Sequence, residues 1–158
     1  MATNNSINQY NPQACFMVRP ANNKVNVTGG GVAYTVAFDE IIYDNTSSFN
    51  IGTYTFVAPY TGRYFLAANV QLSNLPAILN TLLINIDTSV TDCGSIWTSN
   101  NSKSVGNLYI LQSSFIVSLV VGSTATVSVN SSGGTQTVSV DTTSAVDPLT
   151  FFCGYLIR

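Results

Sequence analysis

FVAPYTGRYFLAANVQL, residues 56–72, is the stretch that decides the fold class. It places a proline and a glycine three residues apart, between two aromatic-rich segments that alternate in polarity. Proline fixes φ and cannot donate to a sheet ladder, so Pro59 ends one strand, and Gly62 permits a tight return into the next. The flanking segments are therefore predicted to pair as a hairpin or to form a sheet corner.

The rest of the chain repeats this pattern of short strands and turns. Helical periodicity is nearly absent, and the one run that resembles it, residues 74–85, contains Pro76. Turn clusters rich in Gly, Pro, Asn and Ser separate segments with β-branched and aromatic bias, which is typical of an all-β sandwich or barrel. The expected strands are 14–18, 24–28, 32–43, 53–58, 63–72, 78–87, 107–120, 124–129, 135–140 and 149–157.

Composition excludes several classes of protein. The 158 residues suffice for one domain, predicted over 13–158 after an N-terminal extension, 1–12. Charged residues make up 8% of the chain, against roughly 25% in an average globular protein, so the surface has to be Asn, Ser, Thr and Gln. A net charge of −2 offers no basic stripe for nucleic acid. No apolar run approaches the roughly 20 residues of a membrane helix, and the start lacks the pattern of a secretory signal.

Catalytic chemistry finds little support in the sequence. The chain has no histidine, which excludes Ser–His, Cys–His and imidazole metal sites. Asp39 and Glu40 are neighbours on an expected strand and so point to opposite faces. We expect one to be solvated and the other to pair with a cation such as Arg63. The sequence thus predicts a protein that is not an enzyme and needs no cofactor.

Two expected strands carry apolar residues on both faces. They are TLLINI, residues 81–86, and FIVSLVV, residues 115–121. In an antiparallel sheet this pattern indicates that the second face is also covered. Another subunit is the simplest cover, and the few charges would not keep copies apart, so a homo-oligomer is predicted.

Three segments, read together, resemble the C1q domain of the C1q and tumour-necrosis-factor superfamily. They are VAFDEIIYDN (36–45), FVAPYTGRYFLAANV (56–70) and the terminal FFCGYLIR (151–158), with Ala14-Cys15-Phe16 resembling the family's first strand. The chain also departs from the family pattern. Tyr54 stands where the family usually has glycine, with Gly52 displaced, and Ser123 stands where it has aspartate.

The resemblance implies a ten-stranded antiparallel jelly roll that assembles as a homotrimer around apolar strands. It assigns trimer or core packing to a set of aromatic, proline and glycine positions: Phe56, Pro59, Gly62, Tyr64, Phe65, Phe152, Gly154 and Tyr155. Animal members usually carry a signal and collagen-like repeats before the domain, which this chain lacks. A virion, phage or bacterial surface protein fits its bare start and its richness in Asn, Ser and Thr, and truncation of a longer chain would account for the bare start equally well.

The loops supply the candidate ligand sites. Trp97 lies in a polar loop with Asn100, Asn101 and Lys103, where it can stack on a sugar or a protein, or instead pack against the barrel mouth or the next subunit. Calcium is a weaker alternative, because neither of two Asp-bearing loops has EF-hand spacing. Its candidate ligands are Asp87, Asp92, Asp141 and Asp147.

The three cysteines, Cys15, Cys93 and Cys153, show no C-x-x-C spacing. They are interpreted as small buried hydrophobic residues, with a disulfide between Cys15 and Cys153 as the alternative.

The function predicted from these observations is a non-enzymatic trimeric recognition or attachment head on a virion, phage or bacterial surface, extracellular or particle-bound. It would bind a receptor or glycan through its loops. Two alternatives stay open: a structural module that trimerises and caps a fibre or coat, and a secreted C1q-like pattern-recognition or signalling ligand.

Overall fold

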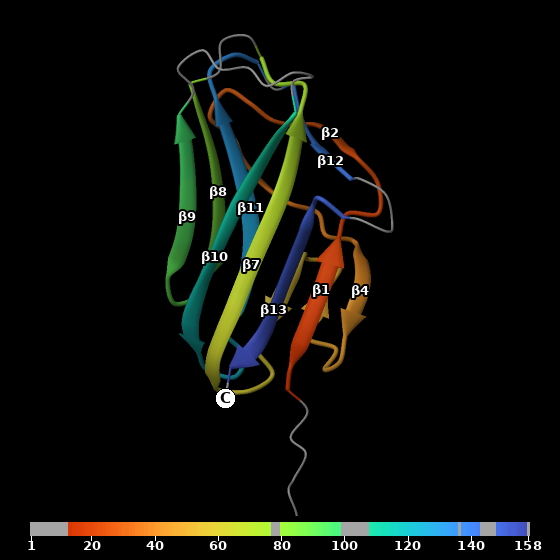
Figure 1. The fold of residues 1–158 in the computed structure, drawn as a ribbon, viewed down its shortest axis with the longest axis vertical. Coiled ribbons are helices and arrows are strands. Elements are labelled where there is room, and N and C mark those ends of the chain that lie inside the picture. Colours follow the sequence, from red (N-terminus) through yellow and green to blue (C-terminus); the bar gives the residue numbers. More distant parts are fainter. Residues whose placement is uncertain (1–12, 77–79, 99–107, 136, 143–147, 158) are drawn as a thin grey trace, which may run out of the picture.

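The computed structural model describes residues 13–76, 80–98, 108–135, 137–142 and 148–157, and they form two antiparallel sheets packed face to face (Figure 1). Thirteen strands build the described part of the chain: β1 Cys15–Arg19, β2 Lys24–Thr28, β3 Ala33–Thr35, β4 Glu40–Asp44, β5 Phe49–Asn50, β6 Thr55–Val57, β7 Gly62–Ser73, β8 Thr81–Thr88, β9 Asp92–Thr98, β10 Tyr109–Leu119, β11 Thr124–Ser132, β12 Val138–Asp141 and β13 Phe151–Ile157.

The seven-stranded sheet faces the viewer in Figure 1 and is organised around the long strand β7. Strand β10 pairs with one edge of β7 along the whole length of β10. The other edge of β7 pairs first with β13, over residues 63–69, and then with β12, over residues 71–73. Strands β1 and β4 follow β13, and β2 follows β12.

The six-stranded sheet lies behind and is organised around β11. One edge of β11 pairs with β8, which in turn pairs with β9. Its other edge pairs with β6 near one end and with β3 near the other. All these pairings are antiparallel, so the expected antiparallel jelly roll is confirmed.

The stretch around Pro59 and Gly62 forms a corner between the sheets, because β6 belongs to one sheet and β7 to the other. The buried phenol of Tyr64 closes this corner. Its hydroxyl donates to the carbonyl oxygen of Tyr60 at 2.8 Å, and the Tyr60 N–H donates back to it at 3.3 Å. Burial raises the pKa of Tyr64 above the usual tyrosine value, although its bond to the Tyr60 backbone opposes the rise.

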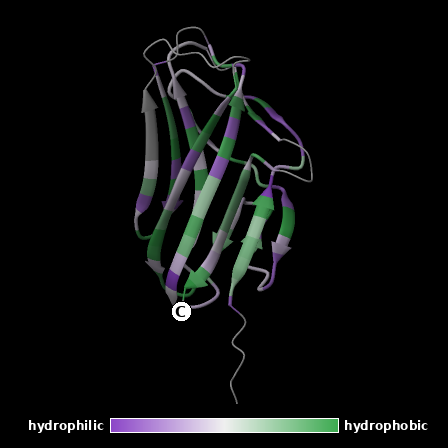
Figure 2. Cartoon of the chain, in the orientation of Figure 1, coloured by the Kyte–Doolittle hydropathy of each residue, from purple (hydrophilic) through white to green (hydrophobic). Residues whose placement is uncertain are grey.

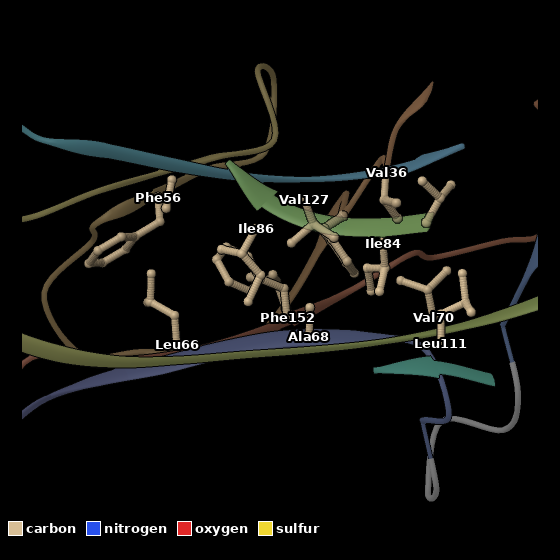
Figure 3. Packing of buried hydrophobic residues seen from close by; sticks show 14 of the residues in the cluster. Val36, Phe56, Leu66, Ala68, Val70, Ile84, Ile86, Leu111, Val127 and Phe152 are labelled. Carbon is tan, nitrogen blue, oxygen red and sulfur yellow. The ribbon is translucent and has the colours of Figure 1, made fainter. Parts of the chain in front are cut away.

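Side chains at alternate positions of β7 and its partner strands fill the core between the two sheets (Figure 3). Leu66, Ala68 and Val70 of β7 face Ile84, Ile86 and Val127 of the opposite sheet. At the end nearer the corner the filling is aromatic: the rings of Phe16 and Phe56 stack with centroids 4.5 Å apart, and Phe152 meets Phe16 edge-on at 5.1 Å. Such pairs add to the free energy gained by burial alone.

The structure differs from the expected strands in three places. Residues 32–43 form β3 and β4 rather than one strand, because Val36, Ala37 and Phe38 turn into the core between them. Strand β9 was not expected, because residues 92–98 were interpreted as loop. The two-residue strand β5 was not expected either, and it completes the increase from ten strands to thirteen.

Tyr54 adopts a φ of +57°, in the left-handed region that glycine tolerates best. It lies in the turn between β5 and β6. This is the position at which the chain departs from the family's glycine, so the departure places a bulky side chain on a strained backbone.

Candidate functional site

The outer face of the seven-stranded sheet carries large apolar side chains in line with one another. The backbone register places Phe65 of β7 opposite Ile116 of β10 on one side and Tyr155 of β13 on the other. These three residues alternate with core residues and therefore point outward. Ile116 is 61% exposed and Tyr155 44% exposed, and the rings of Phe65 and Tyr155 lie 5.4 Å apart.

The apolar character extends across the neighbouring strands. Cys153 lies opposite Ala67 on β7 and opposite Met17 on β1, and Met17 in turn lies opposite the exposed Tyr43 on β4. Figure 2 shows hydrophobic residues along β1, β7 and β13. We call the outward residues of β10, β7, β13, β1 and β4 the front face: Ile110, Gln112, Ser114, Ile116, Ser118, Arg63, Phe65, Ala67, Asn69, Gln71, Phe151, Cys153, Tyr155, Ile157, Cys15, Met17 and Tyr43.

The outer face of the six-stranded sheet is different. On β11 the residues that alternate with the core are Thr124, Thr126, Ser128, Asn130 and Ser132. Their partners on β8 include Asn85 and Asp87, and the Ser128 hydroxyl donates to Asp87 at 2.6 Å. Leu83, opposite Asn130, is an apolar exception. The outer face of the six-stranded sheet is thus mainly polar, whereas apolar side chains cover much of the outer face of the seven-stranded sheet.

The cysteines are all free thiols, so the alternative of a Cys15–Cys153 disulfide is wrong. The register explains this: Cys15 lies opposite Tyr155 and Cys153 opposite Met17, so the two cysteines are only diagonal neighbours. Burial raises the pKa of the Cys153 thiol. Burial also raises the pKa of Tyr43, with smaller contributions from Cys153 and Cys15.

Asp39 and Glu40, one of which was expected to be solvated, both form ion pairs. Asp39 accepts a hydrogen bond from Lys24 Nζ at 2.6 Å, and Glu40 accepts one from Arg19 at 2.7 Å. The expectation that one of them is solvated is therefore wrong, and the pairing cations are Lys24 and Arg19 rather than Arg63, which was suggested as an example. Asp39 also accepts the Ala21 N–H at 2.7 Å, so it fastens the turn after β1 to the segment before β4.

The pKa of Asp39 reflects this arrangement. Partial burial on its own raises the pKa of the carboxyl group. The hydrogen bonds from Lys24 and from the Ala21 backbone outweigh burial and hold the pKa below its usual value. We interpret the Asp39–Lys24 pair as a structural clip, because its donors and acceptors are used within the fold.

The structure locates the other proposed site residues as follows. Phe56, Tyr64, Phe152 and Gly154 lie in the core, whereas Phe65 and Tyr155 lie on the front face and Pro59 and Gly62 at the corner. Trp97 lies within β9 opposite the buried Leu82, not in a loop, and its side chain is not described. Asn100, Asn101 and Lys103 fall outside the described residues.

The structure describes one of the two loops proposed for calcium, residues 87–92, and only the start of the other, residues 141–147. Asp87 and Asp92 are paired across the β8–β9 hairpin, where Asp87 accepts from Ser128 and Asp92 accepts the Thr88 N–H at 3.1 Å. Asp141 ends β12 in the other sheet, and Asp147 is outside the described residues. In the described part of the chain, no three His, Cys, Asp or Glu side chains group as metal ligands do.

The front-face residues of β10 and the start of β13 were not singled out from the sequence. Ile110, Gln112 and Ser114 on β10, together with Asn69 and Phe151, join the face only through strand register. The available signal was the two-faced pattern of residues 115–121. Among the described residues, the structure has no helix that is long and apolar enough to cross a membrane.

A family model of the C1q domain matches residues 16–157, nearly the whole chain. The chain belongs to the C1q-domain family. No curated protein matches it. Among solved structures, it is similar to the globular domain of zebrafish complement 1qA, with a TM-score of 0.61 and 16% sequence identity, covering 92% of this chain and 98% of that one.

Murine APRIL is also similar in fold. Its structure at pH 5.0 matches with a TM-score of 0.58 and 12% identity, and its structure at pH 8.5 with a TM-score of 0.57 and 13% identity. Both comparisons cover 92% of this chain and 99% of the other. At these identities the likeness shows a shared fold, which the C1q and tumour-necrosis-factor-like domains have in common. Domains of this family are generally recognition or signalling modules rather than enzymes.

Proposed function

We propose that the protein is a non-enzymatic homotrimeric recognition or attachment head, displayed on a virion, phage or bacterial surface, that binds a receptor or glycan through its loops. The observation that carries the proposal is the contrast between the two outer faces. Ile116, Phe65 and Tyr155 are aligned across three strands of the front face, whereas Thr, Ser and Asn side chains dominate the back.

An aligned apolar face of this kind supports self-association. Exposed single hydrophobic residues are ordinary, but contiguous apolar patches mark sites of interaction. The front face brings few charges that would be desolvated on contact: Arg63 lies at its lower end, and Arg19 is already paired with Glu40. The copy number of three rests on the family.

A trimer built on the front faces leaves the polar sheet and the loops free for a ligand. The low charge of the chain argues for a partner recognised by hydrogen bonds and stacking rather than by electrostatic attraction. On these grounds of residue chemistry, our proposed contact residues remain Asn100, Asn101 and Lys103, which follow β9 in the chain, together with Trp97 within β9. A neutral glycan or a receptor protein would suit them.

The solution mass tests the assembly. Light scattering with and without a calcium chelator should give three copies of the 16.8 kDa chain in both conditions. The substitution Ile116→Glu should produce a folded single chain, because three glutamates would have to be desolvated in the trimer. Val25→Glu on β2 is the matched control, since Val25 is 68% exposed against 61% for Ile116 and β12 separates β2 from β7. A single-chain mass for the unmodified protein would refute the proposed interface.

A structural module that trimerises and caps a fibre or coat is the second candidate. Burial between subunits would account for the exposed apolar side chains of the front face without any ligand. Binding assays of the assembled protein against glycan arrays and host cells distinguish the two. Reproducible binding that is lost in Trp97→Ala, while the trimer mass is retained, supports the recognition head. Absence of binding across both screens supports the capping module.

A further inference from the structure

Sulfur-bearing side chains gather at one place on the front face, where β1 pairs with β13. Cys15 and Met17 are alternate residues of β1, and Cys153 of β13 lies directly opposite Met17. All three point outward, because their chain neighbours Phe16 and Phe152 are buried in the core. Two of the three cysteines of the chain and one of its two methionines thus occupy adjoining positions.

The separation of the two thiols suits a metal ion better than a disulfide. Cys15 lies opposite Tyr155, two residues after Cys153, so the two cysteines are diagonal neighbours. Diagonal residues lie about 7–8 Å apart, with somewhat closer Cβ atoms, whereas a disulfide needs Cβ atoms roughly 3.5–4.5 Å apart. A metal ion bonded to two thiolates at about 2.3 Å each lets the sulfur atoms lie up to about 4.6 Å apart, against about 2 Å in a disulfide, so it spans the longer gap.

The donor atoms at this point are soft ligands. Thiolate and thioether sulfur favour soft cations such as Cu(I), whereas calcium and magnesium require oxygen, and structural zinc takes four ligands. The acidic residues of β4, the strand on the other side of β1, are engaged within the fold: Glu40 accepts from Arg19, and Asp44 accepts the Phe49 N–H at 2.8 Å. The chain has no histidine. Sulfur is therefore the donor that this part of the front face offers.

Aromatic side chains flank the sulfur atoms. Tyr43 of β4 lies opposite Met17, and Tyr155 of β13 lies opposite Cys15. The tyrosines are the more exposed residues, at 48% and 44%, whereas the three sulfur residues are partly buried. We expect the two rings to keep some water away from a bound cation, which strengthens its attraction to charged sulfur.

We propose that Cys15, Met17 and Cys153 together bind one soft monovalent cation of the Cu(I) class. Each thiol releases its proton to water as its sulfur bonds the cation, and the Met17 thioether bonds through a lone pair without losing a proton. The oxidation state of the metal does not change. All three ligands belong to one chain, so the inference goes beyond the proposed recognition function and does not depend on a second copy. The bound cation fastens the first strand of the fold to the last.

The test is an anaerobic titration of the protein with Cu(I) against a competing chelator, with the ions per chain counted by native mass spectrometry. We expect one ion per chain. Cys15→Ser and Cys153→Ser should each weaken binding by more than about 100-fold, and Met17→Leu by at least about tenfold, since losing even an outer partner of a metal ligand costs about 10–100-fold. Cys93→Ser is the matched control and should leave the affinity unchanged, because Cys93 is also a partly buried free thiol but lies on β9 in the other sheet.

Two further measurements distinguish a lost ligand from a damaged fold. Circular dichroism without copper should show the same β-sheet signal and urea midpoint in every variant, and Cys15→Ala and Cys153→Ala should repeat the serine results without the added hydroxyl. Copper should raise the urea midpoint of the unmodified protein and of Cys93→Ser more than that of Cys15→Ser, because it binds the folded state. X-ray absorption should show only sulfur bonded to the copper.

Three outcomes would overturn the inference: nitrogen or oxygen as the main copper ligands, equal weakening by Cys93→Ser and Cys15→Ser, or unchanged affinity in Cys15→Ser or Met17→Leu. The second outcome would mean that each thiol binds copper independently. The ions are counted per chain, so none of these results depends on whether copies associate. The solution mass tests the proposed assembly separately.

Discussion

Gly154 of β13 is packed so closely that a single added methyl group should disturb the core. A Cβ at this position would lie 2.6 Å from Leu66 Cδ2, 2.9 Å from Phe16 Cε1 and 2.9 Å from the backbone oxygen of Phe65. Carbon atoms in favourable contact lie about 3.5–4.0 Å apart, so the two carbon contacts would be too short by roughly 0.6–0.9 Å. The oxygen belongs to β7, the strand that pairs with β13, and it cannot move away without disturbing that pairing.

We therefore expect Gly154→Ala to lower the free energy of unfolding by about 3 kcal/mol, at the upper end of the range for overpacked cores. For a domain of this size the melting temperature should fall by roughly 6–12 °C. Urea denaturation followed by circular dichroism, at one fixed protein concentration, measures the effect, because association would otherwise change the apparent stability.

Gly62→Ala is the matched control. The Cβ there would come within 2.5 Å of Leu156 Cδ1, which is the end of a flexible side chain that can rotate away. We expect a loss of about 1 kcal/mol or less. Equal stability of the two variants would refute the argument, because it would show that the close approach of β1, β13 and β7 does not constrain the fold.

Three further substitutions test the backbone, the corner and the charged clip. Tyr54→Gly should raise the free energy of unfolding by about 0.5–1 kcal/mol, since glycine tolerates the φ of +57°. A lower melting temperature in thermal denaturation would contradict this, because it would mean that contacts of the tyrosine ring stabilise the fold by more than the backbone strain destabilises it. Tyr64→Phe should lower stability by about 1–2 kcal/mol, because the Tyr60 carbonyl oxygen loses its donor; an unchanged urea midpoint would contradict this. Asp39 has a lowered pKa in the folded state, so its contribution is present above the usual value of 3.8 and is lost as the pH falls through the folded pKa. Asp39→Asn should therefore flatten the decline of stability below about pH 4, and an unaltered acid profile would exclude the Lys24 pair as its cause.

The fold was accessible from the sequence because its strongest signals are local. Pro59 and Gly62 mark a corner whatever the rest of the chain does, and alternation over residues 63–72 indicates a half-buried strand. The misplaced elements depend on distant contacts. Residues 92–98 form β9 because they pair with β8. Residues 36–38 leave the sheet because the Phe38 side chain is buried in the core.

The charge pairs show the same limit. Arg63 was a reasonable partner for Asp39 or Glu40 in a chain with five cations, but proximity in the folded chain selects Lys24 and Arg19. Lys24 lies 15 residues before Asp39, and Arg19 lies 21 residues before Glu40. Arg19 comes close to Glu40 because β1 pairs with β4, which no charge pattern in the sequence discloses.

The front face illustrates why a two-faced pattern is an incomplete signal. Residues 81–86 and 115–121 have similar apolar runs, yet in β8 the outward Leu83 lies opposite Asn130, whereas in β10 the outward Ile116 lies opposite Phe65. An apolar side chain becomes part of an interface only when register aligns it with others, and Ile116, Phe65 and Tyr155 come from strands far apart in the chain. Periodicity indicates that a face needs a cover, and sheet order decides which face it is.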